Sequence, residues 1–249
     1  MTRATARAQA QSFDRLAADY DRLGELGENH LGQRLISVLP GTGGRALDLG
    51  CGGGRHAVLL ADRFAHVDAI DLAEPMIELA RARRSRPNVT YWQSDLHDVT
   101  GAGQYDFILS VMTLHHVPDL RVALSRIKSL LAPGGRVVIV DCYDIRPDRP
   151  SIWWRLRLAV QTAVPLRLRL HALAVLRGGR DLAHRGPATA WRIYRLATKR
   201  DWLDHRVSDR PFSLGVLRSI CADLFPASRI ETVGGAGTWL IWDAPTPAS

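Results

Sequence analysis

The chain has 249 residues, of which 46% are hydrophobic and 23% are charged. This length and composition exclude a disordered chain, and also a small domain that needs a metal or disulfides to fold. The three cysteines (Cys51, Cys142 and Cys221) have no paired spacing, and the sequence shows no run of 18 uncharged apolar residues and no secretory signal pattern. We therefore expect reduced thiols, no transmembrane helix and a cytoplasmic location.

The net charge of +8 is concentrated in one segment. Residues 151–200 contain eleven Lys and Arg residues and a single acid, so the rest of the chain is nearly neutral. A basic segment attracts phosphate, nucleic acid or anionic lipid, but a run of charges is also an ordinary solvated surface. The charge alone therefore does not select a partner.

In chain order, the sequence predicts an N-terminal helical segment and then alternating strands and helices. Apolar residues recur at spacings of three and four within residues 12–39, and PGTGG at 40–44 ends this segment. Short apolar runs predict strands at 45–49, 67–71, 89–93, 105–112 and 136–141. Helices are predicted at 55–64, 75–84 and 120–131. Such an alternation indicates a parallel, doubly wound α/β sheet that binds ligands beyond the carboxyl ends of its strands.

The alternation stops after Asp141. Residues 145–212 are basic and contain several tryptophans, and they include an amphipathic helix that ends at Pro165. A helix over 213–225 and a β-hairpin at a sheet edge over 229–243 follow. We expect a single domain with four parts: an N-terminal helical cap (1–44), a ligand-binding core (45–144), a helical insertion or lid after the fifth strand (145–212), and the last helix with the hairpin (213–249).

The first predicted strand runs into the glycine-rich sequence LDLGCGGGR at 47–55. Glycine permits backbone torsions and a close ligand approach that a Cβ would block. The spacing departs from the G-x-G-x-x-G of dinucleotide-binding loops, because Arg55 stands where the third glycine would be. Asp48 would repel a pyrophosphate but would attract an ammonium or sulfonium group. The loop therefore predicts a ligand with a cationic group.

Two further acids end the next two predicted strands. Asp71 follows the glycine loop at about the spacing of twenty residues that is usual for a carboxylate accepting both hydroxyls of a ribose. Asp95 follows the third strand, where an acid can accept the exocyclic amine of adenine, and Leu96 supplies the next backbone N–H. A single acid would be interpreted as a helix cap. Three acids at successive strand ends favour a nucleoside ligand.

Together these motifs resemble the class I S-adenosylmethionine-dependent methyltransferases. The matching pieces occur in the expected order between residues 45 and 141: ALDLGCGGGRHAVLLA, VDAIDLAEPMIELAR, SDLHDV, DFILSVMTLHHVPDL and LAPGGRVVIVD. The sequence FDRLAADYD at 13–21 also resembles this group, within its small-molecule branch that includes quinone-biosynthesis enzymes. The resemblance implies a Rossmann-like sheet of seven strands ending in an antiparallel hairpin. It also implies S-adenosylmethionine as methyl donor and S-adenosylhomocysteine as product.

The resemblance places one group of residues along the methionine part of the donor. These are Asp48, Gly50, Cys51, Gly52, Ser110 and Val111. It implies that Asp48 orders the loop and faces the amino group of the donor. Tyr20 would cover the donor from the N-terminal helix, or it is equally an aromatic core residue of that helix.

A second group would hold the adenosine part. The resemblance implies that Asp71 binds the ribose, that Leu72 and Met76 contact the adenine face, and that Asp95 with Leu96 contacts the adenine edge.

Transfer of a methyl group from a sulfonium depends mainly on positioning and the exclusion of water, but an oxygen or acidic-carbon acceptor also needs a base. His115 and His116 follow the fourth predicted strand, and His205 precedes the last helix, in a segment that often lines the acceptor pocket of this family. The His115–His116 pair is alternatively a structural feature of the loop. No Cys and His cluster has metal-ligand spacing, so no metal is expected.

The acceptor is expected to be a small molecule, and a pocket-forming insertion favours a specialised metabolite. An alternative is a membrane-associated lipid or quinone, collected by peripheral membrane contact through residues 151–176. RNA methylation and non-catalytic binding of S-adenosylmethionine are weaker alternatives, since the sequence shows no RNA-binding module and all donor positions are intact. The oligomeric state, monomer or homodimer, stays open, as does the choice among O-, N- and C-methylation.

Overall fold

The computed structural model describes residues 13–27, 29–101, 103–144, 165, 168, 186–208, 211–233 and 237–246. The chain forms two compact units, one within 1–17, 29–145 and 210–249 and the other within 18–28 and 146–209. The predicted amphipathic helix before Pro165 lies outside the described residues. In the part of the chain that is described, no helix is both long enough and apolar enough to cross a membrane.

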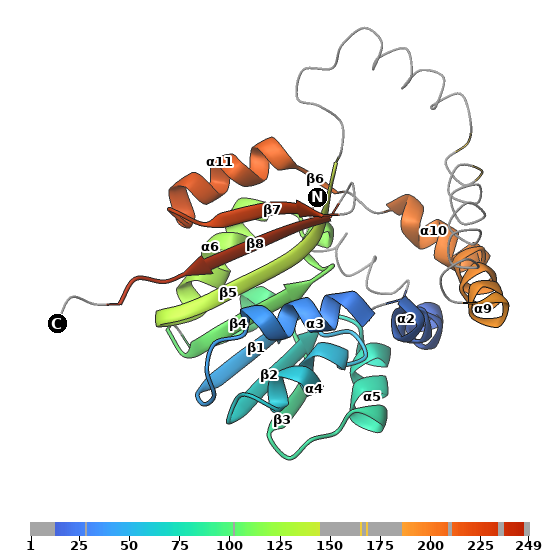
Figure 1. Cartoon of the computed structure of the whole chain (residues 1–249), viewed down its shortest axis with the longest axis horizontal. Helices are drawn as coiled ribbons and strands as arrows, with labels where there is room; N and C mark the ends of the chain where they lie inside the picture. Colours follow the sequence, from blue (N-terminus) through green and yellow to red (C-terminus); the bar gives the residue numbers. More distant parts are fainter. Residues whose placement is uncertain are drawn as a thin grey trace, which may run out of the picture. The chain divides into compact units, whose positions relative to one another are not determined.

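The first unit is built around one sheet with the strand order β3-β2-β1-β4-β5-β8-β7, and the short strand β6 pairs with β5 (Figure 1). The strands are β1 (Arg45–Leu49), β2 (His66–Asp71), β3 (Val89–Gln93), β4 (Tyr105–Val111), β5 (Leu131–Asp144), β6 (Phe212–Ser213), β7 (Arg229–Val233) and β8 (Gly237–Asp243). Strands β1 to β5 pair in parallel, whereas β8 is antiparallel to both β5 and β7. The topology confirms the predicted α/β fold and its edge hairpin.

Helices cover both faces of the sheet. On one face, α6 (Leu120–Leu130) and α11 (Leu214–Leu224) bury apolar side chains against the strands. On the other face, α3 (Asn29–Val38), α4 (Arg55–Ala61) and α5 (Glu74–Arg83) do the same. Because the central strands are buried on both sides, their sequences are nearly continuous apolar runs.

The remaining elements are α2 (Phe13–Gly27), η1 (Leu96–Asp98), η2 (Leu114–His116), α9 (Pro187–Ala197) and α10 (Arg200–Ser208). The predicted helical segment at 12–39 is thus two helices, α2 and α3. The sequence pattern does not indicate β6, because two residues paired with Tyr143 and Asp144 are too short to show a period. β5 begins at Leu131, before the predicted start, and its pairing with β4 shifts register across the PGG sequence.

A hydrogen-bonded group of three side chains connects β1, β2 and β4. The carboxylate of Asp68, whose side chain is 7% exposed, accepts hydrogen bonds from Arg45 Nε at 2.7 Å and from the Tyr105 hydroxyl at 2.9 Å. Arg45 and Tyr105 stand at the amino ends of β1 and β4. A buried carboxylate is costly unless it has such partners, so this group stabilises the amino-terminal edge of the sheet.

We predict that Tyr105→Phe lowers the free energy of unfolding by about 1.5–3 kcal/mol, because its hydroxyl donates to a charged group. The matched change Tyr91→Phe removes a hydroxyl that donates to the neutral carbonyl of Arg84 at 2.9 Å, and it should cost only about 0.5–1.5 kcal/mol. Urea unfolding of both variants measures the difference. Equal losses, or a larger loss for Tyr91→Phe, would contradict the assignment of Tyr105 as a donor to Asp68.

Candidate functional site

The glycine loop leaves the carboxyl end of β1 and rests on the neighbouring strand. The backbone N–H groups of Gly50 and Cys51 donate to the carbonyl oxygen of Ile70 on β2 at 2.8 and 2.9 Å. Gly50, Gly52 and Gly54 have φ angles of 72°, 51° and 82°, a left-handed conformation that a Cβ disfavours. The path of the backbone therefore requires glycine here, independently of any ligand.

Asp71 joins the glycine loop to the end of β2. One carboxylate oxygen accepts the N–H of Gly52 at 2.8 Å, and the other accepts the N–H of Ala73 at 2.9 Å. Burial raises the pKa of Asp71, and the amides of Ala73 and Gly52 oppose this increase. Asp71 thus orders the loop through the backbone N–H of Gly52. The family resemblance implies this role for Asp48.

Asp48 is buried at the end of β1 without such donors. It is 1% exposed, and neither carboxylate oxygen accepts a hydrogen bond from any residue that the structure describes. Burial raises the pKa of Asp48 to about 6, and the charge of Asp71 adds to the increase, whereas the His56 ring, the backbone N–H of Ala57 and the charge of Arg55 oppose it. The Ala57 N–H therefore acts on the carboxylate without reaching the geometry of a full hydrogen bond. A buried carboxylate in this state is costly unless a cationic group lies beside it. Asp48 fits a ligand with an ammonium or sulfonium group.

The other residues predicted for the methionine part lie in the glycine loop after β1 and at the end of β4, which pairs with β1. Ser110 is fully buried, and its hydroxyl has no hydrogen-bond partner among the described residues. Val111 follows it as the last residue of β4 and is buried. Burial raises the pKa of the Cys51 thiol, so its side chain is an inert part of the core. A Cβ added at Gly52 would meet no atom within 4 Å, which leaves room for a ligand.

The residues predicted for the adenosine part follow β2 and β3: Asp71 ends β2 and Leu72 comes next, Met76 lies on α5, and Asp95 and Leu96 lie at the start of η1. Asp95 precedes η1, and one of its oxygens accepts the N–H of His97 at 3.0 Å. This is the capping contact expected of a loop acid, and it leaves the second oxygen for another donor. Leu96 and Met76 are buried, whereas Leu72 is half-buried.

His115 and His116 lie in η2, the turn that follows β4. His115 is 5% exposed, and its Nδ1 lies 2.6 Å from a carboxylate oxygen of Asp141 near the end of β5. The ring of His116 lies against those of His115 and Phe13, with centroid distances of 3.8 and 6.5 Å. Both histidines are predicted as candidate bases, whereas Asp141 is not among the predicted site residues. Its position carries a signal, because Asp141 ends a predicted strand as Asp71 does.

Tyr20 and His205 belong to the second unit. There both rings contact Trp202, at centroid distances of 5.6 Å for Tyr20 and 5.9 Å for His205. His205 is 4% exposed and lies on α10, while Tyr20 lies on α2. The two residues, which are remote in sequence, therefore share one aromatic cluster.

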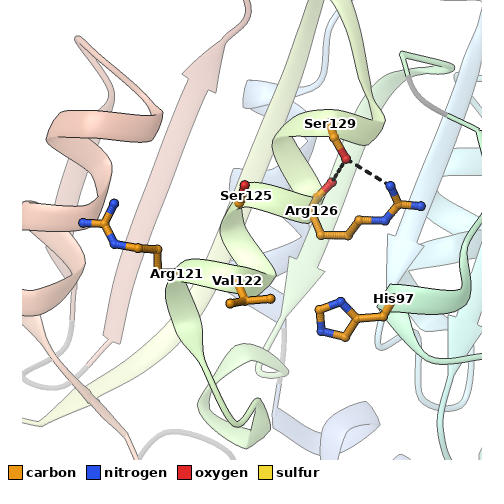
Figure 2. Close-up of a pocket in the computed structure, with 6 residues that line it drawn as sticks. All are labelled: His97, Arg121, Val122, Ser125, Arg126 and Ser129. Atoms are coloured by element: carbon orange, nitrogen blue, oxygen red, sulfur yellow. Dashed lines mark hydrogen bonds between the residues drawn. The ribbon is translucent and has the colours of Figure 1, made fainter.

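A separate groove of about 430 Å³ runs along α6 beside η1 (Figure 2). It is lined by His97, Arg121, Val122, Ser125, Arg126 and Ser129. None of the residues predicted for the donor or for catalysis lines it. Figure 2 shows His97 facing Val122, with Arg121 directed toward the opposite side of α6. This groove is distinct from the glycine-loop site.

The chain matches the family described as a methyltransferase domain over residues 46–135. The malonyl-[acyl-carrier protein] O-methyltransferase of Salmonella typhimurium is 30% identical over 196 residues, which cover 77% of this chain and 76% of that protein. The aklanonic acid methyltransferase DauC of a Streptomyces species is 34% identical over 140 residues, 53% of this chain and 63% of the relative. A solved complex of DhpI with SAH, S-adenosylhomocysteine, has a TM-score of 0.63 at 20% identity and covers 100% of both chains.

Shorter matches are found to other methyltransferases. The ubiquinone biosynthesis O-methyltransferase of Marinobacter nauticus is 37% identical over 104 residues, 39% of this chain and 44% of the relative. The chain spans about half, 55%, of the uncharacterized mycobacterial methyltransferases that it also matches. The match to the Salmonella enzyme extends over most of both proteins. This chain belongs to the class I S-adenosylmethionine-dependent methyltransferases, a family of enzymes whose methyl donor is S-adenosylmethionine.

We predict that Gly50→Ala destabilises the fold more than Gly52→Ala. Both positions have a positive φ, which costs a residue with a Cβ about 1–2 kcal/mol. At Gly50 the new Cβ would also lie 2.1 Å from Thr113 Oγ1, whereas at Gly52 it would meet nothing within 4 Å. Thermal or urea unfolding should therefore show an additional loss of at least about 1 kcal/mol for Gly50→Ala. Equal losses would show that the contact with Thr113 is easily relieved.

Proposed function

We propose that this protein transfers the methyl group of S-adenosylmethionine to an oxygen atom of a small molecule, and that this acceptor is a specialised metabolite. The observation that carries the proposal is the Asp48 carboxylate, buried beside the glycine loop with no hydrogen-bond donor among the described residues. A cationic amino acid moiety, as in the methyl donor, supplies the charge that this carboxylate lacks. Membership of the methyltransferase family agrees with this interpretation.

The residues present fit the donor. We propose that Asp48, the loop from Gly50 to Gly52, and Ser110 hold its methionine part. After accepting the N–H groups of Gly52 and Ala73, the Asp71 carboxylate still has acceptor capacity, which suits a ribose hydroxyl. The free oxygen of Asp95 suits the exocyclic amine of adenine. The remaining donor contacts we propose are Cys51, Leu72, Met76, Leu96 and Val111.

When bound, the donor supplies a methyl group already activated by the positive sulfur. The protein then has to hold the acceptor in line with that group and to exclude water. A phenol acceptor must also lose a proton, whereas a carboxylic acid is already ionised at neutral pH. For a phenol, His116 and His205 stay the candidates for a base. Within the second unit, Tyr20, Trp202 and His205 form an aromatic cluster, and such rings suit contact with an apolar or aromatic molecule.

The relatives favour an oxygen acceptor. The malonyl-[acyl-carrier protein] and ubiquinone enzymes are both named O-methyltransferases. The Streptomyces relative is named for aklanonic acid, so two of these relatives are named for acidic acceptors. These names support a carboxyl or phenol oxygen in a specialised metabolite as the methyl acceptor.

A second candidate is a quinone, supported by the match to the ubiquinone enzymes. This alternative would be served by the membrane contact predicted for residues 151–176, which lie largely outside the described residues. A cytoplasmic location is also part of the proposal, and the free thiols of Cys51, Cys142 and Cys221 support it.

Methyl transfer can be tested directly with isotope-labelled S-adenosylmethionine. Polyketide carboxylic acids, malonyl-acyl carrier protein, hydroxylated quinones and RNA serve as acceptors. We expect labelled methyl ester or ether from the first class, and none from Asp71→Ala, which loses the ribose acceptor. Asp223→Asn, on the exposed surface of α11, is the matched control and should keep full transfer. Labelling of quinone or RNA alone would overturn the proposed acceptor, and donor binding without any transfer would favour a non-catalytic role.

We predict that binding of S-adenosylhomocysteine becomes tighter as the pH rises from 5 to 7. The pKa of Asp48 is raised to about 6 in the free protein, and the ammonium group of the ligand favours the ionised carboxylate. Affinity should therefore fall below pH 6, by up to about tenfold per pH unit, and level off above it. Calorimetry at several pH values measures this, and Asp48→Asn should bind weakly with much less pH dependence. The same pH profile in Asp48→Asn would contradict the role of Asp48.

A further inference from the structure

Among the acids at the carboxyl ends of the strands, Asp141 accepts the most hydrogen bonds from the described residues. It is 1% exposed and accepts four hydrogen bonds. One oxygen accepts the backbone N–H groups of Leu114 at 2.7 Å and His115 at 3.3 Å. The other accepts His115 Nδ1 at 2.6 Å and the N–H of Cys142 at 2.7 Å. A single side chain on β5 thus holds both the backbone and a ring of η2.

His115 is held in its charged form by this contact. Burial alone would lower the pKa of His115, but the hydrogen bond to Asp141, aided by Cys142, outweighs burial and raises the pKa to about 10. An imidazolium has no lone pair with which to accept a proton from an acceptor molecule. The arrangement therefore suits a buried ion pair that tethers the turn.

The two residues between β4 and the tethered turn, Met112 and Thr113, connect it to the glycine loop. Met112, directly after β4, has a φ of 54°, an uncommon conformation for a residue with a side chain. Its N–H donates to the Val140 carbonyl oxygen at 2.7 Å. Thr113 Oγ1 lies 3.1 Å from the carbonyl oxygen of Val111, and 3.3 and 3.4 Å from those of Leu49 and Gly50. The Thr113 side chain also packs against Gly50, where an added Cβ would lie 2.1 Å from Oγ1. Contacts therefore lead from Asp141 through η2 and Thr113 to Gly50.

We propose that Asp141 is a positioning residue for the donor site. Its carboxylate, bonded to the His115 ring and to the backbone of η2, holds residues 112–116 against Gly50 and so fixes the glycine loop in the shape that binds the methionine part of the donor. This inference rests on the proposed function. It assigns His115 to the tether and leaves His116 and His205 as the candidate bases.

The test uses the full chain and S-adenosylhomocysteine as the probe. Asp141→Asn keeps the shape of the side chain but removes the charge, leaving His115 and two amides with weaker acceptors. We expect its affinity for S-adenosylhomocysteine, measured by calorimetry at pH 7.5, to fall at least tenfold. Asp68→Asn is the matched control, since Asp68 is a buried carboxylate bonded at the amino-terminal edge of the sheet. It should lower the melting temperature but leave the affinity within twofold.

Nuclear magnetic resonance provides an independent readout of the tether. The Nδ1–H proton of His115 should give a strongly downfield signal at pH 8 in the wild-type protein and in Asp68→Asn, and this signal should be absent in Asp141→Asn. His115→Gln, which keeps a neutral donor, should lose affinity to a smaller extent. If Asp141→Asn fails to fold, His115→Gln decides the question, because wild-type affinity in that variant would overturn the proposal.

The outcomes separate this proposal from the proposed function. If the wild-type protein does not bind S-adenosylhomocysteine, the proposed function fails. If the wild-type protein binds it and Asp141→Asn binds within twofold, the positioning role is wrong and the proposed function stands. Equal loss of affinity in Asp141→Asn and Asp68→Asn would show a general loss of stability and would also overturn the positioning role.

Discussion

A carboxylate removed from water must find hydrogen-bond donors or a cation, and this constraint determines the structure of the sheet edge where the parallel strands end. Backbone N–H groups of the loops supply hydrogen bonds to the carboxylates of Asp71, Asp95 and Asp141. Each of these contacts fixes a loop relative to a strand. Asp48 has no such donor among the described residues, and it is the acid from which a cationic ligand has most to gain.

The parallel sheet brings these acids together. β1 pairs with β2 on one side and with β4 on the other, and β4 pairs with β5, so the carboxyl ends of these strands lie along one edge. At the amino-terminal edge of the sheet, the donors to a buried carboxylate are side chains: Arg45 and Tyr105 donate hydrogen bonds to Asp68. At the amino-terminal edge, the buried carboxylate has hydrogen-bond donors within the protein. At the carboxyl-terminal edge, the Asp48 carboxylate and the buried Ser110 hydroxyl form no hydrogen bond with the described residues.

The sequence predicts the fold closely because buried parallel strands need continuous apolar runs, and glycine and proline mark the breaks between them. The acids at strand ends are also visible in the sequence, which is why Asp71 and Asp95 could be placed. The hydrogen-bond partners of the acids are not visible. Nothing in the sequence tells that the Gly52 amide donates to Asp71, or that Asp141 binds a histidine 26 positions earlier. The left-handed backbone of Met112 is equally hidden, because methionine gives no signal for it.

The position of β8 has a consequence for how the sheet is assembled during synthesis. β8 lies between β5 and β7, and its register places Leu240 beside Ile139 on one side and Ile230 on the other. As the ribosome releases the chain, β5 therefore lacks its β8 partner until residues 237–243 emerge, and residues 146–209 of the second unit are made in between. An open edge of this kind pairs readily with other chains. Formation of the last hairpin therefore covers this edge of β5 and completes the sheet.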